Sequence, residues 1–158
     1  MTAAPHSLVV GGGIMGLSSA WALARLGHRV TLLEQGPIPN PLGSSVDRHR
    51  LIRFTYGAEA GYSAMVADAY EAWDRLWADL GRTLYHHTGT LCIGRDDHRW
   101  LDDSAATLEA LDHPIEWIGL DRLARDYPLI ARDGLDRAFL ARTGGVLLAD
   151  AIVAALAT

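Results

Sequence analysis

Cysteine is nearly absent from this sequence, because its 158 residues include a single one, Cys92. One thiol cannot form an internal disulfide, which excludes a disulfide-stabilised secreted protein and fits a reducing compartment. We therefore predict a cytoplasmic location and interpret Cys92 as a small apolar residue within a strand.

Positive charge and targeting signals are also scarce. Fourteen Lys and Arg against 19 Asp and Glu give a net charge of −5, so we expect no general nucleic-acid binding. The uncharged stretch between His6 and Arg25 contains three adjacent glycines, which make a poor membrane-spanning helix. The residues before it lack the Lys or Arg of a signal peptide. The composition predicts an ordinary soluble globular chain of one domain.

A glycine-rich motif organises the first 34 residues. An apolar run, Leu8–Val10, precedes the motif, and a helical pattern follows it as far as Gly27. A second apolar run, Val30–Leu33, ends at Glu34. Gly11, Gly13 and Gly16 have the spacing G-x-G-x-x-G, and Gly12 lies between the first two of them. Strand, glycine turn, helix, strand and acid in this order predict a dinucleotide-binding βαβ unit.

Each position of the motif has a physical reason. Gly11 permits the tight turn, and Gly13 lets the backbone approach a pyrophosphate. Gly16 allows the helix to lie close to the strand, and the helix start near Ile14 directs free N–H groups at phosphates. Glu34 lies 21 positions after Gly13, near the ~20 typical of an acid that binds adenosine ribose hydroxyls. The acid disfavours NADP, and the motif leaves FAD and NAD open.

A proline-rich loop and an arginine segment follow the acid. Three prolines lie within residues 37–41, and the sequence GSSVDRHRLIRF occupies residues 43–54. Its small residues favour close approach to a cofactor and its arginines favour an anion, whereas the alternative is a solvated charged turn. Because Arg50 and Arg53 are three residues apart, we expect them to share one side of a helical turn.

The remaining sequence predicts further helices and strands. Helices are expected at 62–80, from about 96 to 111, at 120–127 and from 151 onward, with strands at 115–118, 138–140 and 146–148. A hairpin is expected over 83–93, with its turn at Thr88-Gly89. His86 and His87 are neighbours on one of its strands and face opposite sides, so we predict no metal site there.

The parallel sheet is expected to be incomplete. Only the strands near Leu8 and Val30 clearly belong to it, and a parallel pair cannot bury both of its faces. No strand follows the last helix to complete a crossover. We therefore expect the chain to be the N-terminal part of a longer protein.

Several segments together resemble a known family. They are VVGGGIMGLSSAWALARLGHRVTLLEQ, GSSVDRHRLIRFTYG, HTGTLCIG and the Asp-Tyr-Pro and Gly-Gly-Val-Leu segments. Over essentially the whole chain, the combination resembles the FAD-dependent amine oxidoreductases of the D-amino-acid oxidase superfamily. The branch it resembles most is that of monomeric sarcosine oxidase and N-methyltryptophan oxidase, and R-L-I-R-F-T-Y-G is the part most specific to that branch.

The resemblance implies an α/β fold with a Rossmann-like FAD-binding βαβ unit and the start of an α+β substrate domain, truncated. Residues 1–80 would form the FAD-binding region, 81–140 a partial substrate-domain segment, and 141–158 an incomplete return towards the FAD-binding domain. The cofactor would be FAD. The reaction would remove hydride from the carbon beside the nitrogen of an amino acid or N-methyl amino acid such as sarcosine, with oxygen or another electron acceptor.

The resemblance also implies roles for single residues. Arg50 would lie near the flavin ring, and Arg53 would bind the substrate carboxylate, for which a planar guanidinium is a natural partner. Ser45 and Val46 stand where the sarcosine oxidase branch often has histidines, and Cys92 does not match its flavin-attachment cysteine. The residues that would hold FAD are Gly11, Gly12, Gly13, Ile14, Met15, Gly16, Glu34, Gln35, Ser44, Ser45 and Arg50.

Two other functions use the same features. An NAD-dependent dehydrogenase would share the βαβ unit but would normally continue with further βα repeats after the acid, whereas this chain continues with a proline-rich loop. A non-catalytic truncated fragment would bind a dinucleotide weakly or not at all, and the incomplete sheet favours it for the chain as given.

Overall fold

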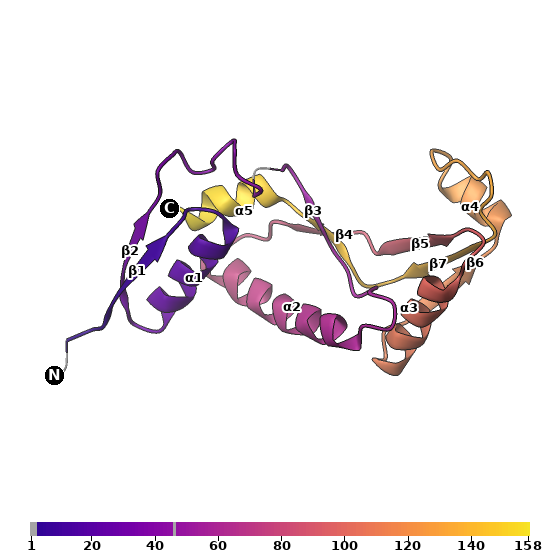
Figure 1. Cartoon of the computed structure of the whole chain (residues 1–158), viewed down its shortest axis with the longest axis horizontal. Coiled ribbons are helices and arrows are strands. Elements are labelled where there is room, and N and C mark those ends of the chain that lie inside the picture. The colour runs from indigo at the N-terminus through magenta and orange to yellow at the C-terminus, as the bar shows by residue number, and fades with distance from the viewer. Residues whose placement is uncertain (1–2, 46) are drawn as a thin grey trace. The chain divides into compact units, whose positions relative to one another are not determined.

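The structure is a computed structural model that describes residues 3–45 and 47–158, and Figure 1 shows its elements in chain order. Two compact units divide the chain. The first comprises residues 1–50 and 147–158, and the second comprises residues 51–146. The sheets and helices of both units form the mixed α/β fold that the sequence predicts.

The first unit contains the predicted βαβ motif. The strands β1 (His6–Val10) and β2 (Arg29–Leu33) pair in parallel along their whole length. The helix α1 (Ile14–Arg25) connects them, and α5 (Ala149–Leu156) packs against α1. The predicted strands, glycine turn and connecting helix are therefore confirmed.

The parallel pair buries one face. Leu17 of α1 and Ile152 and Val153 of α5 are almost fully buried in the first unit. Leu8 and Val10 of β1, in contrast, are 62% and 78% exposed. Successive residues of a strand alternate between its faces, so one apolar face of the pair is open in this chain, as the sequence predicts.

The second unit contains most of the remaining strands. In the described part of the chain, β3 to β8 form two three-stranded sheets, with the orders β3–β8–β4 and β5–β7–β6, and β7 pairs antiparallel with both β5 and β6. The strands are β3 (Arg50–Ile52), β4 (Tyr85–His87), β5 (Thr90–Gly94), β6 (Ile115–Ile118), β7 (Arg137–Ala141) and β8 (Gly145–Leu147). The strands predicted at 115–118, 138–140 and 146–148 are confirmed within one or two residues at their ends.

Three helices accompany these strands. They are α2 (Ala60–Leu80), α3 (Arg99–Ala110) and α4 (Leu120–Asp126). Gly81 ends α2 in a left-handed conformation with φ +64°, which glycine adopts readily. The Asp97 carboxylate accepts a hydrogen bond from the first N–H of α3, at 3.0 Å, and so stabilises the start of this helix.

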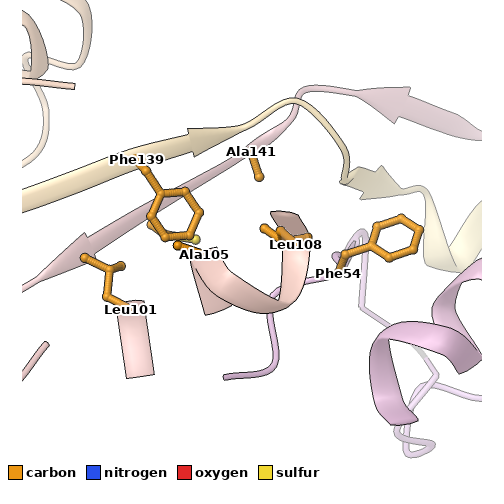
Figure 2. Close-up of a cluster of buried hydrophobic side chains, with 7 residues drawn as sticks. Phe54, Leu101, Ala105, Leu108, Phe139 and Ala141 are labelled. Carbon is orange, nitrogen blue, oxygen red and sulfur yellow. The ribbon is translucent and has the colours of Figure 1, made fainter. Parts of the chain in front are cut away.

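The main core of the second unit lies between α3 and the central strands. Figure 2 shows side chains from α3, from β7 and from residue 54 converging on this cluster. Its members are Phe54, Cys92, Leu101, Ala105, Leu108, Phe139 and Ala141. Cys92 is 4% exposed, and burial raises the pKa of its thiol. The interpretation of Cys92 as a small apolar strand residue is confirmed.

The predicted hairpin over 83–93 is wrong. Both strands form, but β4 pairs with β8 and β5 pairs with β7. Gly89, with φ +71°, bends the chain between β4 and β5, and its N–H donates to the Gly144 carbonyl at 3.1 Å. Thr88-Gly89 is therefore a bend between two strands that do not pair with each other, because β7 and β8, which lie later in the chain, supply their partners.

Arg50 and Arg53 do not lie on a helical turn, so the shared side that such a turn would give them does not form. Arg50 begins β3, so the backbone there is extended. Residues three apart on an extended chain point to opposite sides, and no shared helical face exists. Pairing with β8 overrides the local pattern.

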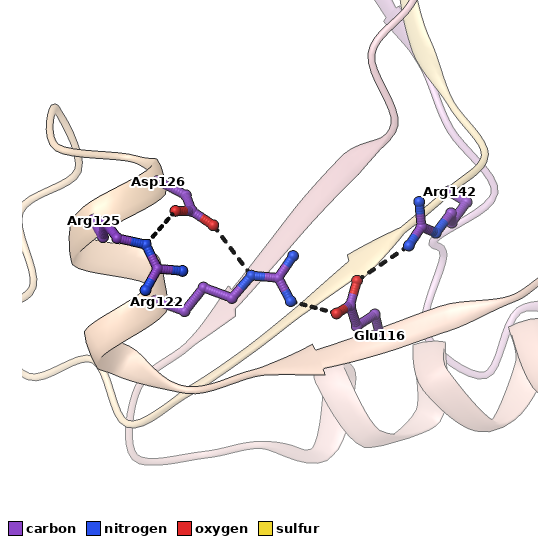
Figure 3. A network of polar contacts seen from close by, with 5 residues as sticks. All are labelled: Glu116, Arg122, Arg125, Asp126 and Arg142. Carbon is purple, nitrogen blue, oxygen red and sulfur yellow. Dashed lines mark hydrogen bonds and ion pairs between the residues drawn. The ribbon is translucent and has the colours of Figure 1, made fainter.

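Charged side chains form a surface network across the second sheet. Glu116 of β6 accepts from Arg122 of α4 and from Arg142, the residue after β7 (Figure 3). Asp126 bridges Arg125 and Arg122 within α4. Hydrogen bonding from Arg122 lowers the pKa of Glu116. The network ties the short α4 to the edge of its sheet.

The described residues contain neither a membrane-spanning helix nor a cluster of metal ligands. Residues 3–45 and 47–158 include no helix that is long and apolar enough to cross a bilayer. The same part of the chain contains no group of three His, Cys, Asp or Glu side chains placed to hold a metal ion.

Candidate functional site

The glycine turn is shaped by two close approaches. Gly11 has φ +105°, a conformation that L side chains rarely adopt, and its N–H donates to the Leu33 carbonyl of β2. A Cβ atom on Gly16 would lie 1.9 Å from the Gly11 carbonyl oxygen. Glycine at these two positions therefore lets the chain turn off β1 and lets α1 rest directly against the turn, as predicted.

The start of α1 is open to an anion. Gly13 is its N-terminal cap residue and has no side chain to cap the first N–H groups. The Ile14 N–H donates to the Ser45 hydroxyl at 3.2 Å, and a Cβ on Gly13 would meet only that hydroxyl, at 3.5 Å. Backbone N–H groups and the positive end of a helix favour phosphate.

Glu34 at the end of β2 is held by backbone amides. One carboxylate oxygen accepts from the Gly12 N–H at 2.7 Å and the other from the Gly36 N–H at 3.0 Å. These two hydrogen bonds, that of Gly12 first, lower the pKa of Glu34. The ionised carboxylate keeps further lone pairs for hydroxyl donors. The start of α1, the glycine turn and this acid together fit the adenosine diphosphate part of a dinucleotide such as FAD.

The segment after the proline-rich loop is held together by contacts of the Arg50 side chain. The Arg50 guanidinium donates to the Ser44 carbonyl at 2.5 Å and pairs with the Asp47 carboxylate at 2.6 Å. The structure thus brings Ser44 and Arg50 together and places Ser45 at the start of α1. Asp47 was missed because a single acid within a basic segment carries no distinguishing pattern. Val46 lies outside the described residues.

Arg53 has a different environment from Arg50. It belongs to the second unit, whereas Arg50 belongs to the first. Its guanidinium carbon lies 5.3 Å from the ring centre of Tyr56 and 5.7 Å from that of Trp100. Within residues 3–45 and 47–158, no carboxylate forms a salt bridge with it. Sequence reasoning left Tyr56 without a role and did not single out Trp100, which lies 47 positions along the chain.

An aromatic pocket in the second unit was not predicted. It has a volume of about 390 Å³ and is lined by Phe54, Tyr70, Tyr85, His87, His113, Thr143 and Gly144. The Tyr70 and Tyr85 hydroxyls lie 3.1 Å apart, and Tyr85 donates to the Gly144 carbonyl at 2.9 Å. Residues from five separate segments form it, so no single sequence pattern marks it.

Known proteins resemble this chain along most of its length. It is 34% identical to peroxisomal sarcosine oxidase of Mus musculus over 152 residues, which cover 95% of this chain and 38% of that protein. It is 25% identical to N-methyl-L-tryptophan oxidase of Yersinia pestis over 122 residues, covering 77% of this chain and 33% of that protein. The chain thus spans little more than a third of the length of these relatives.

Solved structures share the fold. NikD, described as an unusual amino acid oxidase essential for nikkomycin biosynthesis, matches with a TM-score of 0.81 and 29% identity, covering 96% of this chain and 40% of that one. L-proline dehydrogenase from P. horikoshii matches with a TM-score of 0.76 at 22% identity, covering 99% and 41%, which shows the fold alone.

The family follows from a match that spans nearly the whole chain. The sequence profile of the FAD dependent oxidoreductase family (DAO) matches residues 6–158. Its cofactor, FAD, decides between the two dinucleotides that the glycine motif leaves open. The chain belongs to the FAD dependent oxidoreductase family.

Proposed function

We propose that the protein oxidises the C–N bond of an amino acid or N-methyl amino acid, such as sarcosine, with FAD as its cofactor. The observation that carries the proposal is the cradle formed by the start of α1, where Gly13 supplies no capping side chain, and by Glu34, whose carboxylate accepts backbone N–H groups. Two findings support the substrate class. The chain is similar to sarcosine oxidase, and the Arg53 guanidinium, which lies over an aromatic ring, has no carboxylate partner among the described residues.

In this proposal the first unit holds FAD. The N–H groups of Gly13, Ile14 and Met15 would bind the pyrophosphate, with Gly11, Gly12 and Gly16 shaping the turn, and Glu34 would bind the adenosine ribose. Gln35, Ser44, Ser45 and Arg50 would complete the contacts. Arg50, already fixed by Ser44 and Asp47, would present its positive charge near the flavin ring.

The reaction needs a bound, oriented amine. FAD supplies the hydride acceptor for the carbon beside the amine nitrogen, and the resulting imine is hydrolysed by water. Arg53 would bind the substrate carboxylate through paired N–H donors, which fixes the position of the carbon that loses hydride. Oxygen or another acceptor would then remove the electrons.

The domain assignment belongs to the same proposal. Residues 1–80 would serve FAD binding, 81–140 the substrate side, and 141–158 the return to the FAD-binding region. The compact units divide instead after residues 50 and 146. We also propose a cytoplasmic location, on the basis of the single buried thiol, and no nucleic-acid partner.

FAD binding to the purified chain tests the proposal. We expect the chain to retain or take up FAD, visible as flavin absorbance, and to bind NADH far more weakly. The Glu34→Gln variant should bind FAD about 10- to 100-fold more weakly, since it loses hydrogen bonds to a charged group. A chain that takes up no FAD on reconstitution would contradict the proposal.

Catalysis is tested separately from cofactor binding. Bound flavin should bleach under anaerobic conditions when sarcosine is added, and hydrogen peroxide should appear when air is admitted. Because the chain spans 38% of the mouse relative, a second candidate function is FAD binding without turnover. Flavin that binds but is reduced by neither sarcosine, N-methyltryptophan, proline nor glycine would support that second function.

A further inference from the structure

Arg53 lies on a turn whose backbone is fixed by hydroxyl groups of α3. The Gly57 N–H donates to the Ser104 hydroxyl at 2.9 Å, and the Thr107 hydroxyl donates to the Gly57 carbonyl at 2.9 Å. Ser104 is fully buried. Both backbone polar groups of Gly57 are thus bound by one helix, which holds the turn after Arg53 in a single position.

Trp100 lies on the same face of α3 as Ser104 and Thr107. Trp100, Ser104 and Thr107 stand at positions i, i+4 and i+7, which share one side of a helix. A Cβ atom on Gly57 would lie 3.0 Å from Trp100 Cδ1, and Gly57 has φ +62°. The indole therefore rests on the Gly57 backbone, and only glycine gives it both the conformation and the space.

The start of the turn is fixed as well. The Ser63 hydroxyl of α2 donates to the Phe54 carbonyl at 2.8 Å, and the Phe54 ring is buried in the core. Backbone motion at Arg53 is therefore restrained on the side of Phe54 and on the side of Gly57. The arginine side chain extends from this restrained backbone, and its guanidinium lies over the Tyr56 and Trp100 rings.

Another arginine of the second unit that packs on a tryptophan differs from Arg53 in one respect. Arg137 lies 4.4 Å from the Trp117 ring centre, and it also pairs with the Asp102 carboxylate at 2.5 Å. Arg53 has the aromatic support without the carboxylate. Aromatic rings attract a guanidinium without occupying its hydrogen-bond donors as a carboxylate does. Such an arginine is held in place and keeps donors for an external anion.

We propose that Trp100, with Tyr56, is a positioning residue that holds the Arg53 guanidinium ready for a substrate carboxylate. The Ser104 and Thr107 hydroxyls set the distance between α3 and the turn. The inference rests on the proposed function for the carboxylate role of Arg53. The contact of the Arg53 guanidinium with the two rings is observed in the structure, and its effect on the mobility of Arg53 can be measured without substrate.

The first experiment measures the order of the Arg53 side chain in the full chain labelled with ¹⁵N-arginine. The Nε–H signal of Arg53 is identified by its loss in Arg53→Lys. We expect a rigid Nε–H in the native chain, by its heteronuclear NOE, and a mobile one in Trp100→Ala. Trp100→Phe keeps an aromatic ring and should restore most of the rigidity. An Arg53 signal that is equally rigid in Trp100→Ala would overturn the inference.

A matched control separates this effect from a general loss of packing. Trp100 and Trp117 are each 44% exposed, and each lies over an arginine. Trp117→Ala should loosen Arg137 and leave the Arg53 signal unchanged. If both variants loosen Arg53 alike, the support from Trp100 is not specific and the inference fails.

The second experiment adds the anion. Titration with sarcosine should shift the Arg53 Nε–H signal, whereas dimethylamine, which lacks the carboxylate, should not. Trp100→Ala should weaken the sarcosine effect about 2- to 5-fold, the value of one partly exposed cation–π contact. If sarcosine fails to shift Arg53 in the native chain, the carboxylate role in the proposed function is wrong. If Arg53→Lys weakens binding but Trp100→Ala does not, only the positioning role is wrong.

Discussion

At the scale of single residues, Glu34 links the fold to the site. Both of its carboxylate oxygens accept backbone N–H groups, one from the glycine turn and one from the loop that follows β2. The acid therefore holds the two segments that surround the cradle and still offers lone pairs to a ligand.

This arrangement predicts a pH-dependent stability difference. The pKa of Glu34 is lowered in the folded chain by the Gly12 and Gly36 amides. Its contribution is thus present above the ordinary glutamate value of about 4.3 and is lost as the pH falls through the lower folded pKa. Urea unfolding should find the native chain more stable than Glu34→Gln at pH 7, with the gap closing on acidification. A gap that is constant from pH 7 to pH 3 would contradict this assignment.

The pKa of Tyr70 is shifted in the opposite direction to that of Glu34. Its partial burial, followed by the hydrogen bond with the Tyr85 hydroxyl, raises the pKa of Tyr70. The unfolded state ionises first as the pH rises above about 10, so stability should fall in that range. Urea unfolding of the native chain and Tyr70→Phe between pH 8 and pH 11 measures this. The native chain should lose more stability than the variant, and equal losses would show that Tyr70 is not the group responsible.

At the scale of elements, the contact of α1 with the glycine turn is the closest approach in the cradle. Gly16→Ala would place a methyl group 1.9 Å from the Gly11 carbonyl oxygen, a backbone atom that a rotamer change cannot move. The helix must shift, at a cost of about 1–3 kcal/mol, and the N–H groups at its start move with it. We expect lower stability by chemical denaturation together with lost FAD binding.

Gly61 gives a control for that prediction. It also lies in a helix, α2, and a Cβ there would meet nothing within 4 Å. Gly61→Ala should therefore be neutral or stabilise the chain by about 0.5–1 kcal/mol. If the Gly16 and Gly61 variants unfold alike, the close packing of α1 is not what the glycine supplies.

At the scale of the whole molecule, the two units should respond differently to cofactor. The glycine turn, Glu34 and Ser45 all lie in the first unit. FAD that binds the folded chain stabilises it by mass action, so the melting temperature should rise with FAD concentration. Hydrogen exchange should slow at residues 11–16 and 34–36 and change little at 115–118. Protection confined to the second unit would place the cofactor elsewhere.

Much of the fold could be predicted from the sequence because the signals are local. An apolar stripe and Gly81 were sufficient to predict the helix at 62–80. The order of strand, glycine turn, helix and strand was sufficient to predict the βαβ unit. The hairpin at 83–93 failed because Gly89 is a turn residue that serves a bend, and its neighbours pair with strands some 50 residues later. Arg50 and Arg53 do not share a helical face because the chain at Arg50 is extended and pairs with β8.

By itself, the sequence determined the dinucleotide motif, its acid and the identity of the two arginines, because each depends on residue type and spacing along a short segment. Only the tertiary structure decided what surrounds them. Ser45 reaches the start of α1 from 31 positions away, and Trp100 reaches Arg53 from 47. Such contacts depend on how elements pack, which side-chain volume and long-range hydrogen bonds fix and which a local pattern does not contain.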